Sequence, residues 1–241
     1  MDETIIILIL SALAPVLGSL IGVLKKPSDK FMYDMLSFAA GVMLGISFLE
    51  LIPESIEFSS SWICIAGIII GSIVMYVVDR ILPHIHPDCS QEAGRNLNKT
   101  AIYLIAGIGL HNLPEGMAIA VGTVSKSKTS LIVALAIAIH NIPEGICTSA
   151  PYYHCTRNRL KSFLVSSATA IPIIIGFMIA KYLYSIISLQ FVGLLVGATA
   201  GLMIYICADE LIPSSAGKTD NHSTVFALII GVIFVVLLGA I

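Results

Sequence analysis

Charged residues are scarce in this sequence. Asp, Glu, Lys and Arg together make up 12% of the 241 residues, and 57% are hydrophobic, whereas an ordinary soluble domain is about 25% charged and about 45–50% apolar. So little charge cannot cover a water-facing surface, which excludes a soluble enzyme, a nucleic-acid-binding protein and a disordered chain. The formal net charge of −2 indicates no partner by itself. The composition predicts a protein that crosses a membrane several times.

Long apolar runs account for most of the sequence. A bilayer core of roughly 30 Å requires about 20 apolar residues in a helix. A β-barrel would instead show alternating segments of about 10 residues, and backbone groups in lipid must form hydrogen bonds internally, which favours helices. We therefore expect one all-α membrane domain over residues 1–241. Its eight transmembrane spans are Thr4–Leu24, Met32–Leu51, Trp62–Leu82, Ala101–Gly122, Ser130–Ala150, Ser162–Leu183, Gln190–Leu211 and Thr224–Ala240.

Basic residues are distributed unevenly between the connections. The connections after spans 1, 3, 5 and 7, counted with Arg80 at the end of span 3, hold ten Lys and Arg residues, and the other three connections, counted with Lys181 at the end of span 6, hold three. Because cytoplasmic connections carry the excess of Lys and Arg, we expect both termini outside and a multi-pass protein of the cytoplasmic membrane. Cys89 and Cys155 then lie in cytoplasmic connections, where thiols stay reduced. The five cysteines therefore predict no disulfide framework.

Two internal repeats stand out. Residues 111–116 read HNLPEG and residues 140–145 read HNIPEG, in spans 4 and 5. In spans 2 and 7, Gly41 precedes Glu50 by nine residues, as Gly201 precedes Glu210, and Leu-Ile-Pro follows each Glu. An odd number of crossings separates spans 2 and 7, so they run in opposite directions. The pattern predicts a 3+2+3 arrangement, an inverted repeat of helices 1–3 and 6–8 around central helices 4 and 5, which in transporters places the substrate near the midplane.

Ionisable and amide side chains lie within or at the ends of these apolar runs. An ionisable residue at the bilayer centre costs at least ~2.5–3.5 kcal/mol, faces the bundle interior and commonly marks an ion pathway. In each six-residue motif the His, Asn and Glu share one helix face, because three- and four-residue spacings do so. Nitrogen and oxygen ligands without thiolate suit zinc, iron(II), manganese or cobalt. The candidate metal ligands are His111, Asn112, Glu115, His140, Asn141, Glu144, Glu50 and Glu210.

Some of these polar residues also have a structural interpretation. Glu50 and Glu210 lie near span ends, each three residues before a proline, where a capping or interfacial role is the alternative. Asp209 is either a ligand or a neighbour of Glu210 on another face. His84 and His86, in the third connection, either capture a metal weakly or belong to a solvated loop.

The paired motifs, the eight spans, the outside termini and the His-containing third connection resemble the ZIP (Zrt/Irt-like) divalent metal transporters, closest to their ZupT-like bacterial branch. The resemblance covers essentially the whole chain. It implies transport of zinc, and often of iron(II), manganese, cobalt or cadmium, into the cytoplasm, with the metal as substrate rather than cofactor. It also implies a homodimer in the lipid bilayer, no nucleic-acid partner, and sliding of helices 1, 4, 5 and 6 against the rest.

The resemblance further implies a binuclear centre in which both motif glutamates bridge two ions. The first site would take His111, Glu115, His140 and Glu144. The second site would take Asn112, Asn141, Glu115, Glu144 and Glu210, and Glu50 would be a further ligand from helix 2. One residue departs from the branch, because Ile171 stands before Pro172 where relatives often carry Glu. That departure puts a third metal position in helix 6 in doubt.

Three rival functions use parts of the same pattern. A metal-selective channel would use the same ligands, and only its high conductance would distinguish it from slow, saturable transport. An intramembrane metalloprotease requires His-Glu-x-x-His, in which the Glu activates water. Here Asn112 and Asn141 follow the histidines, so we expect no enzyme. A metal sensor requires an output domain, and every connection is shorter than 20 residues.

Overall fold

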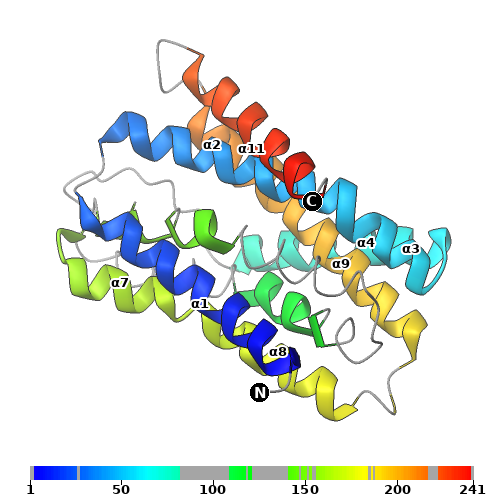
Figure 1. Ribbon diagram of the computed structural model, residues 1–241. Coiled ribbons are helices and arrows are strands. Elements are labelled where there is room, and N and C mark those ends of the chain that lie inside the picture. The colour runs from blue at the N-terminus through cyan, green and yellow to red at the C-terminus, as the bar shows by residue number, and fades with distance from the viewer. Residues whose placement is uncertain are drawn as a thin grey trace.

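The computed structural model describes residues 3–25, 28–81, 109–117, 119–120, 141–146, 148–150, 152–153, 156–183, 186, 188–216 and 222–239. Every regular element within these ranges is a helix (Figure 1). The α-helices are α1 (Glu3–Leu24), α2 (Asp29–Ile46), α3 (Ile52–Phe58), α4 (Ser61–Ile81), α7 (Arg159–Ser167), α8 (Ala170–Leu183), α9 (Leu189–Ile206), α10 (Ile212–Ser215) and α11 (Ser223–Gly239). Two π-helical turns, η1 (Ser47–Leu51) and η3 (Cys207–Leu211), connect α2 to α3 and α9 to α10. Residues 109–117 and 141–146 are also helical.

Several of these helices are long and apolar enough to cross a membrane. In the described part of the chain there are five such stretches: Ile5–Leu24, Tyr33–Phe58, Ser61–Val78, Arg159–Leu183 and Leu189–Leu211. The helix α11 is apolar as well, with 17 residues. The expectation of an all-α protein of membrane type is therefore confirmed. Most of the expected spans 4 and 5, residues 101–122 and 130–150, lies outside the described residues.

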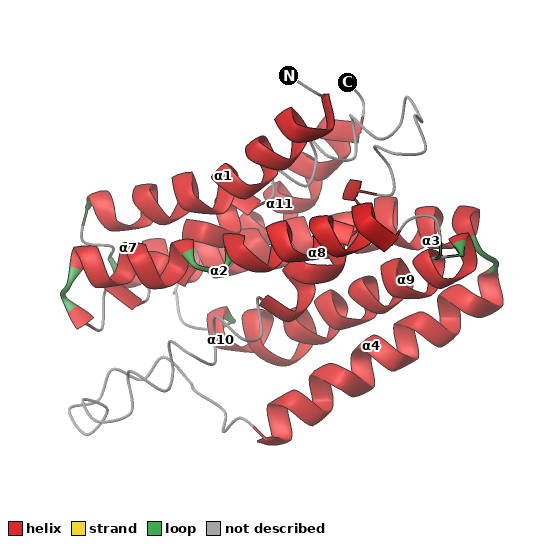
Figure 2. Cartoon of the chain, turned by 90° about the horizontal axis from the view of Figure 1, so that it is seen from below, coloured by secondary structure: helices red, strands yellow, loops and turns green. Residues whose placement is uncertain are grey.

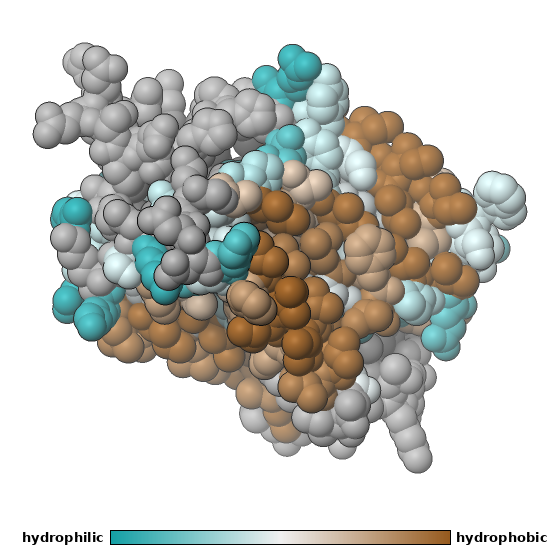
Figure 3. All heavy atoms as spheres, turned by 90° about the horizontal axis from the view of Figure 1, so that it is seen from above, coloured by the Kyte–Doolittle hydropathy of each residue, from teal (hydrophilic) through white to brown (hydrophobic). Residues whose placement is uncertain are grey.

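The distribution of side chains is the inverse of that in a soluble protein. Large apolar residues cover the outside, with Trp62 81% and Leu17 51% exposed, and Figure 3 shows them as a broad continuous area on one face. Serine, threonine, asparagine, glutamate and histidine side chains are buried instead, and Ser11 and Ser19 are both 0% exposed. An apolar exterior around a polar interior is the arrangement that a bilayer stabilises, because lipid rather than water surrounds the helices.

Two expected spans continue beyond their predicted ends at Leu51 and Leu211. In η1 the Ile52 amide donates to the Ser47 carbonyl, five residues earlier, and Ile212 donates to Cys207 in the same way in η3. Each π turn leaves the following proline in the first turn of the next helix, where a missing amide hydrogen costs nothing. The helical path therefore continues through the proline, as far as Phe58 in α3.

The expected sixth span, Ser162–Leu183, is divided into α7 and α8 by a turn at Ala168 and Thr169. Pro172 has no amide hydrogen to donate to the carbonyl of Ala168, four residues earlier. The Ala168 carbonyl instead accepts from the Ile171 amide at 3.0 Å. The proline thus explains why this membrane helix has a break near its middle.

The two halves of the chain repeat one structure at an offset of 160 residues. The elements α2, η1 and α3 begin at positions 29, 47 and 52, and α9, η3 and α10 begin at 189, 207 and 212. Their N-caps match, because Ser28 accepts from the Phe31 amide and Ser188 from the Phe191 amide, both at 3.2 Å. Side by side, α11 packs along α2 (Figure 1) and α4 along α9 (Figure 2).

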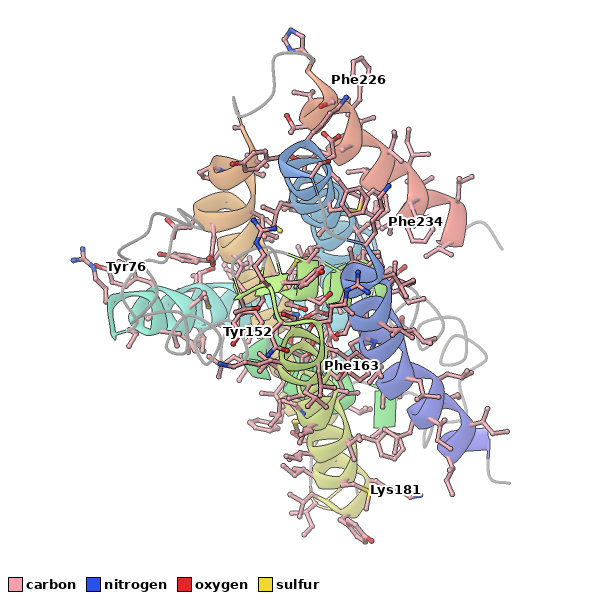
Figure 4. All side chains as sticks on the ribbon, turned by 90° about the vertical axis from the view of Figure 1, so that its left-hand side faces the viewer. Tyr76, Tyr152, Phe163, Lys181, Phe226 and Phe234 are labelled. Atoms are coloured by element: carbon pink, nitrogen blue, oxygen red, sulfur yellow. The ribbon has the colours of Figure 1, made fainter. Side chains whose placement is uncertain are left out.

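Paired glycines bring these helices into close contact. A Cβ atom at Gly41 of α2 would overlap the Leu228 carbonyl oxygen of α11. A Cβ atom at Gly201 of α9 would overlap the Ile68 carbonyl oxygen of α4. The residues of the second contact are related to those of the first by the same offset of 160. Near the first crossing, the rings of Phe38 and Phe234 lie 5.9 Å apart, with Phe234 labelled on α11 in Figure 4.

A second group of helices lies beside this one. The helix α1 packs against α7 and α8, and the helical residues 109–117 and 141–146 join them through close backbone contacts at Gly116 and Gly145. Figure 4 shows Tyr152 where the helices cross, whereas Tyr76, Lys181 and Phe226 lie near outer ends. The described helices thus form two groups, and the repeated six-residue motif belongs to the group that contains α1, α7 and α8.

Candidate metal centre

The polar side chains of the two motifs point into the protein. The exposed fraction is 1% for His111, 0% for Asn112, 1% for Glu115, 0% for Asn141 and 7% for Glu144. Helical backbone at 109–117 and 141–146 explains this, because it puts residues three and four apart on one face. The helix faces inferred from the spacing are therefore buried, as expected. The remaining motif ligand, His140, lies outside the described residues.

One ionisable pair joins the two motifs. The Nε2 atom of His111 lies 2.9 Å from Oε1 of Glu144, and both side chains are almost fully buried. The spacing brings His111 together with Glu115 of its own helix, and only the family resemblance places His111 and Glu144 in one metal site. The structure therefore adds a cross-helix pair that the motif alone did not predict. It brings an imidazole and a carboxylate from separate helices to one point.

Asn112 has a fixed orientation. Its Nδ2 atom donates to the backbone oxygen of Thr169 at 2.8 Å. Because that carbonyl can only accept, the amide nitrogen must face it and Oδ1 must point elsewhere. Thr169 lies in the break between α7 and α8, so the turn caused by Pro172 supplies an anchor for the first motif. The only sequence signal for this anchor was Pro172 in span 6. The position of the proline did not show that Asn112 would form a hydrogen bond with Thr169.

Several polar atoms of the motif side chains are buried without a hydrogen bond. Within the described ranges, Oδ1 of Asn112, Oε2 of Glu144 and both amide atoms of Asn141 have no hydrogen-bond partner. An unsatisfied buried polar group costs about 1–3 kcal/mol, and native structures contain few of them. Oxygen atoms of this kind next to an imidazole are the ligands that zinc, iron(II) and manganese accept. The donor set therefore fits a divalent cation.

The two flanking glutamates lie on the π turns. Glu50 belongs to η1 and is half-buried, whereas Glu210 and its neighbour Asp209 belong to η3 and are exposed. Single π turns inside α-helices occur frequently at functional sites. In the part of the chain that the structure describes, no three His, Cys, Asp or Glu side chains form a group that could hold a metal. The assignment of Glu50 and Glu210 as ligands therefore stays a prediction.

The two cysteines that the structure describes lie between packed helices. Cys64 and Cys207 are buried free thiols, whose sulfur atoms lie 3.8 Å and 3.7 Å from the backbone oxygens of Ile52 and Ala40. Both thiols thus belong to helix packing in the group of α2, α4 and α9. The loop residues His84, His86 and Cys89 lie outside the described ranges, and so do Cys147 and Cys155.

Comparison with known proteins identifies the family of the chain. The family model described as ZIP Zinc transporter matches residues 3–101 and 86–239, which together span nearly the whole chain. A zinc transporter ZupT from Escherichia coli O127:H6 (strain E2348/69 / EPEC) is 35% identical over 240 residues, covering 96% of this chain and 93% of that protein. The ZupT proteins of Escherichia coli O1:K1 / APEC and of strain K12 / DH10B are 34% identical with the same coverage. The chain belongs to the ZIP zinc transporter family.

Proposed function

We propose that this protein carries divalent metal ions, with zinc as the leading substrate, across the cell membrane into the cytoplasm. Family membership supports transport, and the names of the relatives support zinc. The observation that carries the proposal is the buried His111–Glu144 pair, together with the buried Oδ1 of Asn112 that has no hydrogen-bond partner. Iron(II), manganese, cobalt and cadmium are the other candidate substrates, because the same ligand types accept them.

The proposed site is binuclear and uses the side chains of both motifs. Glu115 and Glu144 supply the negative charge that offsets the loss of water around a divalent ion, and they bridge the two ions. The histidines supply imidazole nitrogen and the asparagines amide oxygen. The complete proposed ligand set is His111, Asn112, Glu115, His140, Asn141, Glu144, Glu210 and Glu50.

Ion binding in this site competes with protons. Nε2 of His111 and Oε1 of Glu144 lie 2.9 Å apart. An entering ion must therefore break this contact and bind both side chains instead. Imidazole and carboxylate bind metal only when they are deprotonated. We therefore expect zinc uptake to fall as the outside solution is acidified.

The proposed architecture has eight spans in a 3+2+3 arrangement, with both termini outside and two copies in a dimer. The offset of 160 residues between the halves supports the inverted repeat, because α2 and α11 pack together as α9 and α4 do. The separate group of α1, α7, α8 and the motif helices supports movement of that group against α2, α4, α9 and α11. Such a movement would expose the ion to each side of the membrane in turn.

Uptake into proteoliposomes tests the proposal. Vesicles that contain the purified protein and a metal-sensitive dye are challenged in turn with zinc, iron(II), manganese and cadmium. We expect a saturable zinc signal that Glu144→Ala abolishes, while Glu57→Ala, which changes an exposed carboxylate on α3, leaves the signal intact. A rate of dye response that rises with zinc concentration without saturating would favour the channel. Zinc binding without flux of any ion would refute transport.

A further inference from the structure

The second motif helix packs against α1 in a regular series of contacts. A Cβ atom at Gly145 would overlap the backbone oxygen of Pro15, and a Cβ atom at Gly22 would overlap the side chain of Ser149. Gly145 and Ser149 are one turn apart, so the same stripe of this helix follows α1 in a parallel direction. The next turn toward the start of each helix contains Asn141 on one helix and Ser11 on the other.

The first motif helix packs against α8 in the same way. A Cβ atom at Gly116 would overlap the backbone oxygen of Ile173. One turn earlier on both helices, Nδ2 of Asn112 donates to the Thr169 oxygen at 2.8 Å. Gly145 and Pro15 thus correspond to Gly116 and Ile173. By the same step of four residues, Asn141 and Ser11 correspond to Asn112 and Thr169.

The two residues at the equivalent place have unused hydrogen-bonding capacity. Ser11 and Asn141 are both 0% exposed. Among the described residues, Oγ of Ser11 and both amide atoms of Asn141 have no hydrogen-bond partner. A serine that served only to let two helices approach would have no use for its hydroxyl group, since alanine has nearly the same size. The buried Ser11 hydroxyl lies one helical turn from the contact at Gly145. It can therefore accept the hydrogen bond that the Asn141 amide lacks.

We propose that Ser11 is a positioning residue of the metal site. Its Oγ atom accepts a hydrogen bond from Nδ2 of Asn141, which directs Oδ1 of Asn141 toward the ion. The Thr169 carbonyl does the same for Asn112 in the other half of the site. This hydrogen bond forms when the ion binds Oδ1 of Asn141, because ion binding fixes the orientation of the amide plane. This inference rests on the proposed function, in which Asn141 is a ligand.

The first test measures zinc affinity and transport in Ser11→Ala. Zinc binding to the purified protein in detergent is measured by isothermal titration calorimetry, and uptake by the dye-loaded vesicles. We expect about a tenfold weaker Kd and a KM raised by the same factor, with kcat within twofold of the wild type, since a hydrogen bond worth about 1.4 kcal/mol gives a factor of ten. The matched control is Ser19→Ala, which removes an equally buried hydroxyl of α1 that bonds Ser166 at 2.7 Å. That variant should keep the zinc affinity.

An isosteric pair separates the hydroxyl from the shape of the side chain. Ser11→Thr and Ser11→Val add the same bulk and differ in the hydroxyl group, so a difference in zinc affinity between them reports the hydroxyl. We expect the Thr variant to bind zinc about tenfold more tightly than the Val variant. Equal zinc affinity in these two variants would overturn the positioning role, whatever their stability.

A double-mutant cycle with Asn141→Ala links the two residues. We expect Asn141→Ala to weaken zinc binding and Ser11→Ala to add nothing further in that background, because the hydroxyl acts only through the amide. Additive effects of the two substitutions would refute the inference and leave the proposed site intact. Wild-type zinc affinity in Asn141→Ala would instead remove Asn141 from the ligand set, which overturns the proposed binuclear site and this inference together.

Discussion

The glycine crossings make a quantitative prediction about the repeated packing. A Cβ atom built at Gly41 would lie 2.9 Å from the carbonyl carbon of Leu228 and 3.1 Å from its Cα atom. At Gly201 the Cβ atom would lie 2.7 Å from both the carbonyl carbon and the Cα atom of Ile68. The atoms in the way are backbone, so no side-chain rotation relieves the overlap. Gly41→Ala and Gly201→Ala must therefore push α2 from α11, and α9 from α4.

The magnitude follows from two opposing effects. Overpacking costs typically 1–3 kcal/mol, and a backbone obstacle belongs at the upper end of that range. Replacing glycine by alanine inside a helix also stabilises the folded state by about 1 kcal/mol, because alanine has the higher helix propensity. We therefore expect Gly41→Ala and Gly201→Ala each to lower the free energy of unfolding by about 2 kcal/mol. Gly45→Ala meets only the Val235 side chain, at 3.0 Å, which can adjust, so its net effect should be near zero.

The assay is unfolding of the purified protein in detergent, followed by circular dichroism over increasing denaturant. Gly239→Ala serves as the control, because nothing lies within 4 Å of its Cβ position. We expect the crossing variants to unfold first and to match each other within about 1 kcal/mol, since the two crossings are related by the repeat. If Gly41→Ala were as stable as Gly239→Ala, the close approach of α2 and α11 would be refuted.

Three further predictions concern the site and the helix caps. Glu144→Gln keeps a side-chain oxygen as an acceptor for His111 but removes the negative charge, whose attraction for an ion 4 Å away is about 4 kcal/mol per unit of ionic charge. Zinc uptake should therefore fall below about 1% of the wild-type rate, with an unchanged metal-free melting temperature. Asn112→Leu removes the hydrogen bond from Nδ2 to the Thr169 carbonyl, and calorimetric unfolding should show a loss of about 0.5–1.5 kcal/mol of unfolding free energy. Ser28→Ala and Ser188→Ala remove equivalent N-caps. Denaturant unfolding should show that each substitution lowers the free energy of unfolding by about 1 kcal/mol.

The candidate site was predictable in part. The repeated six-residue motif and the helical period placed His111, Asn112 and Glu115 on one face, and these side chains are buried. The contact between His111 and Glu144 did not follow from the spacing, because spacing along one helix carries no information about which helix lies opposite. Only the family resemblance placed the two residues in one site. The anchoring of Asn112 was missed for the same reason, since Thr169 is 57 residues away along the chain.

The helix ends were also predictable only in part. Hydropathy located the apolar runs, but it placed ends at Leu51 and Leu211, before the prolines. The π turns carry the helical path through these positions. In span 6, Pro172 instead divides the helix into α7 and α8. A proline in a membrane helix thus has several outcomes, and neighbouring helices decide which one occurs by satisfying the freed backbone groups.

The sequence by itself determined the membrane environment, the repeat and the polar residues of the centre. Each of these depends on side-chain chemistry read along the chain, because transfer into lipid is an additive property of successive residues. Only the tertiary structure decided that α2 packs on α11, that α9 packs on α4, and that His111 meets Glu144. Lipid tails are as apolar as leucine, so hydrophobicity does not choose between helix partners. Close packing at small residues and buried hydrogen bonds make that choice, and both exist only once the helices are together.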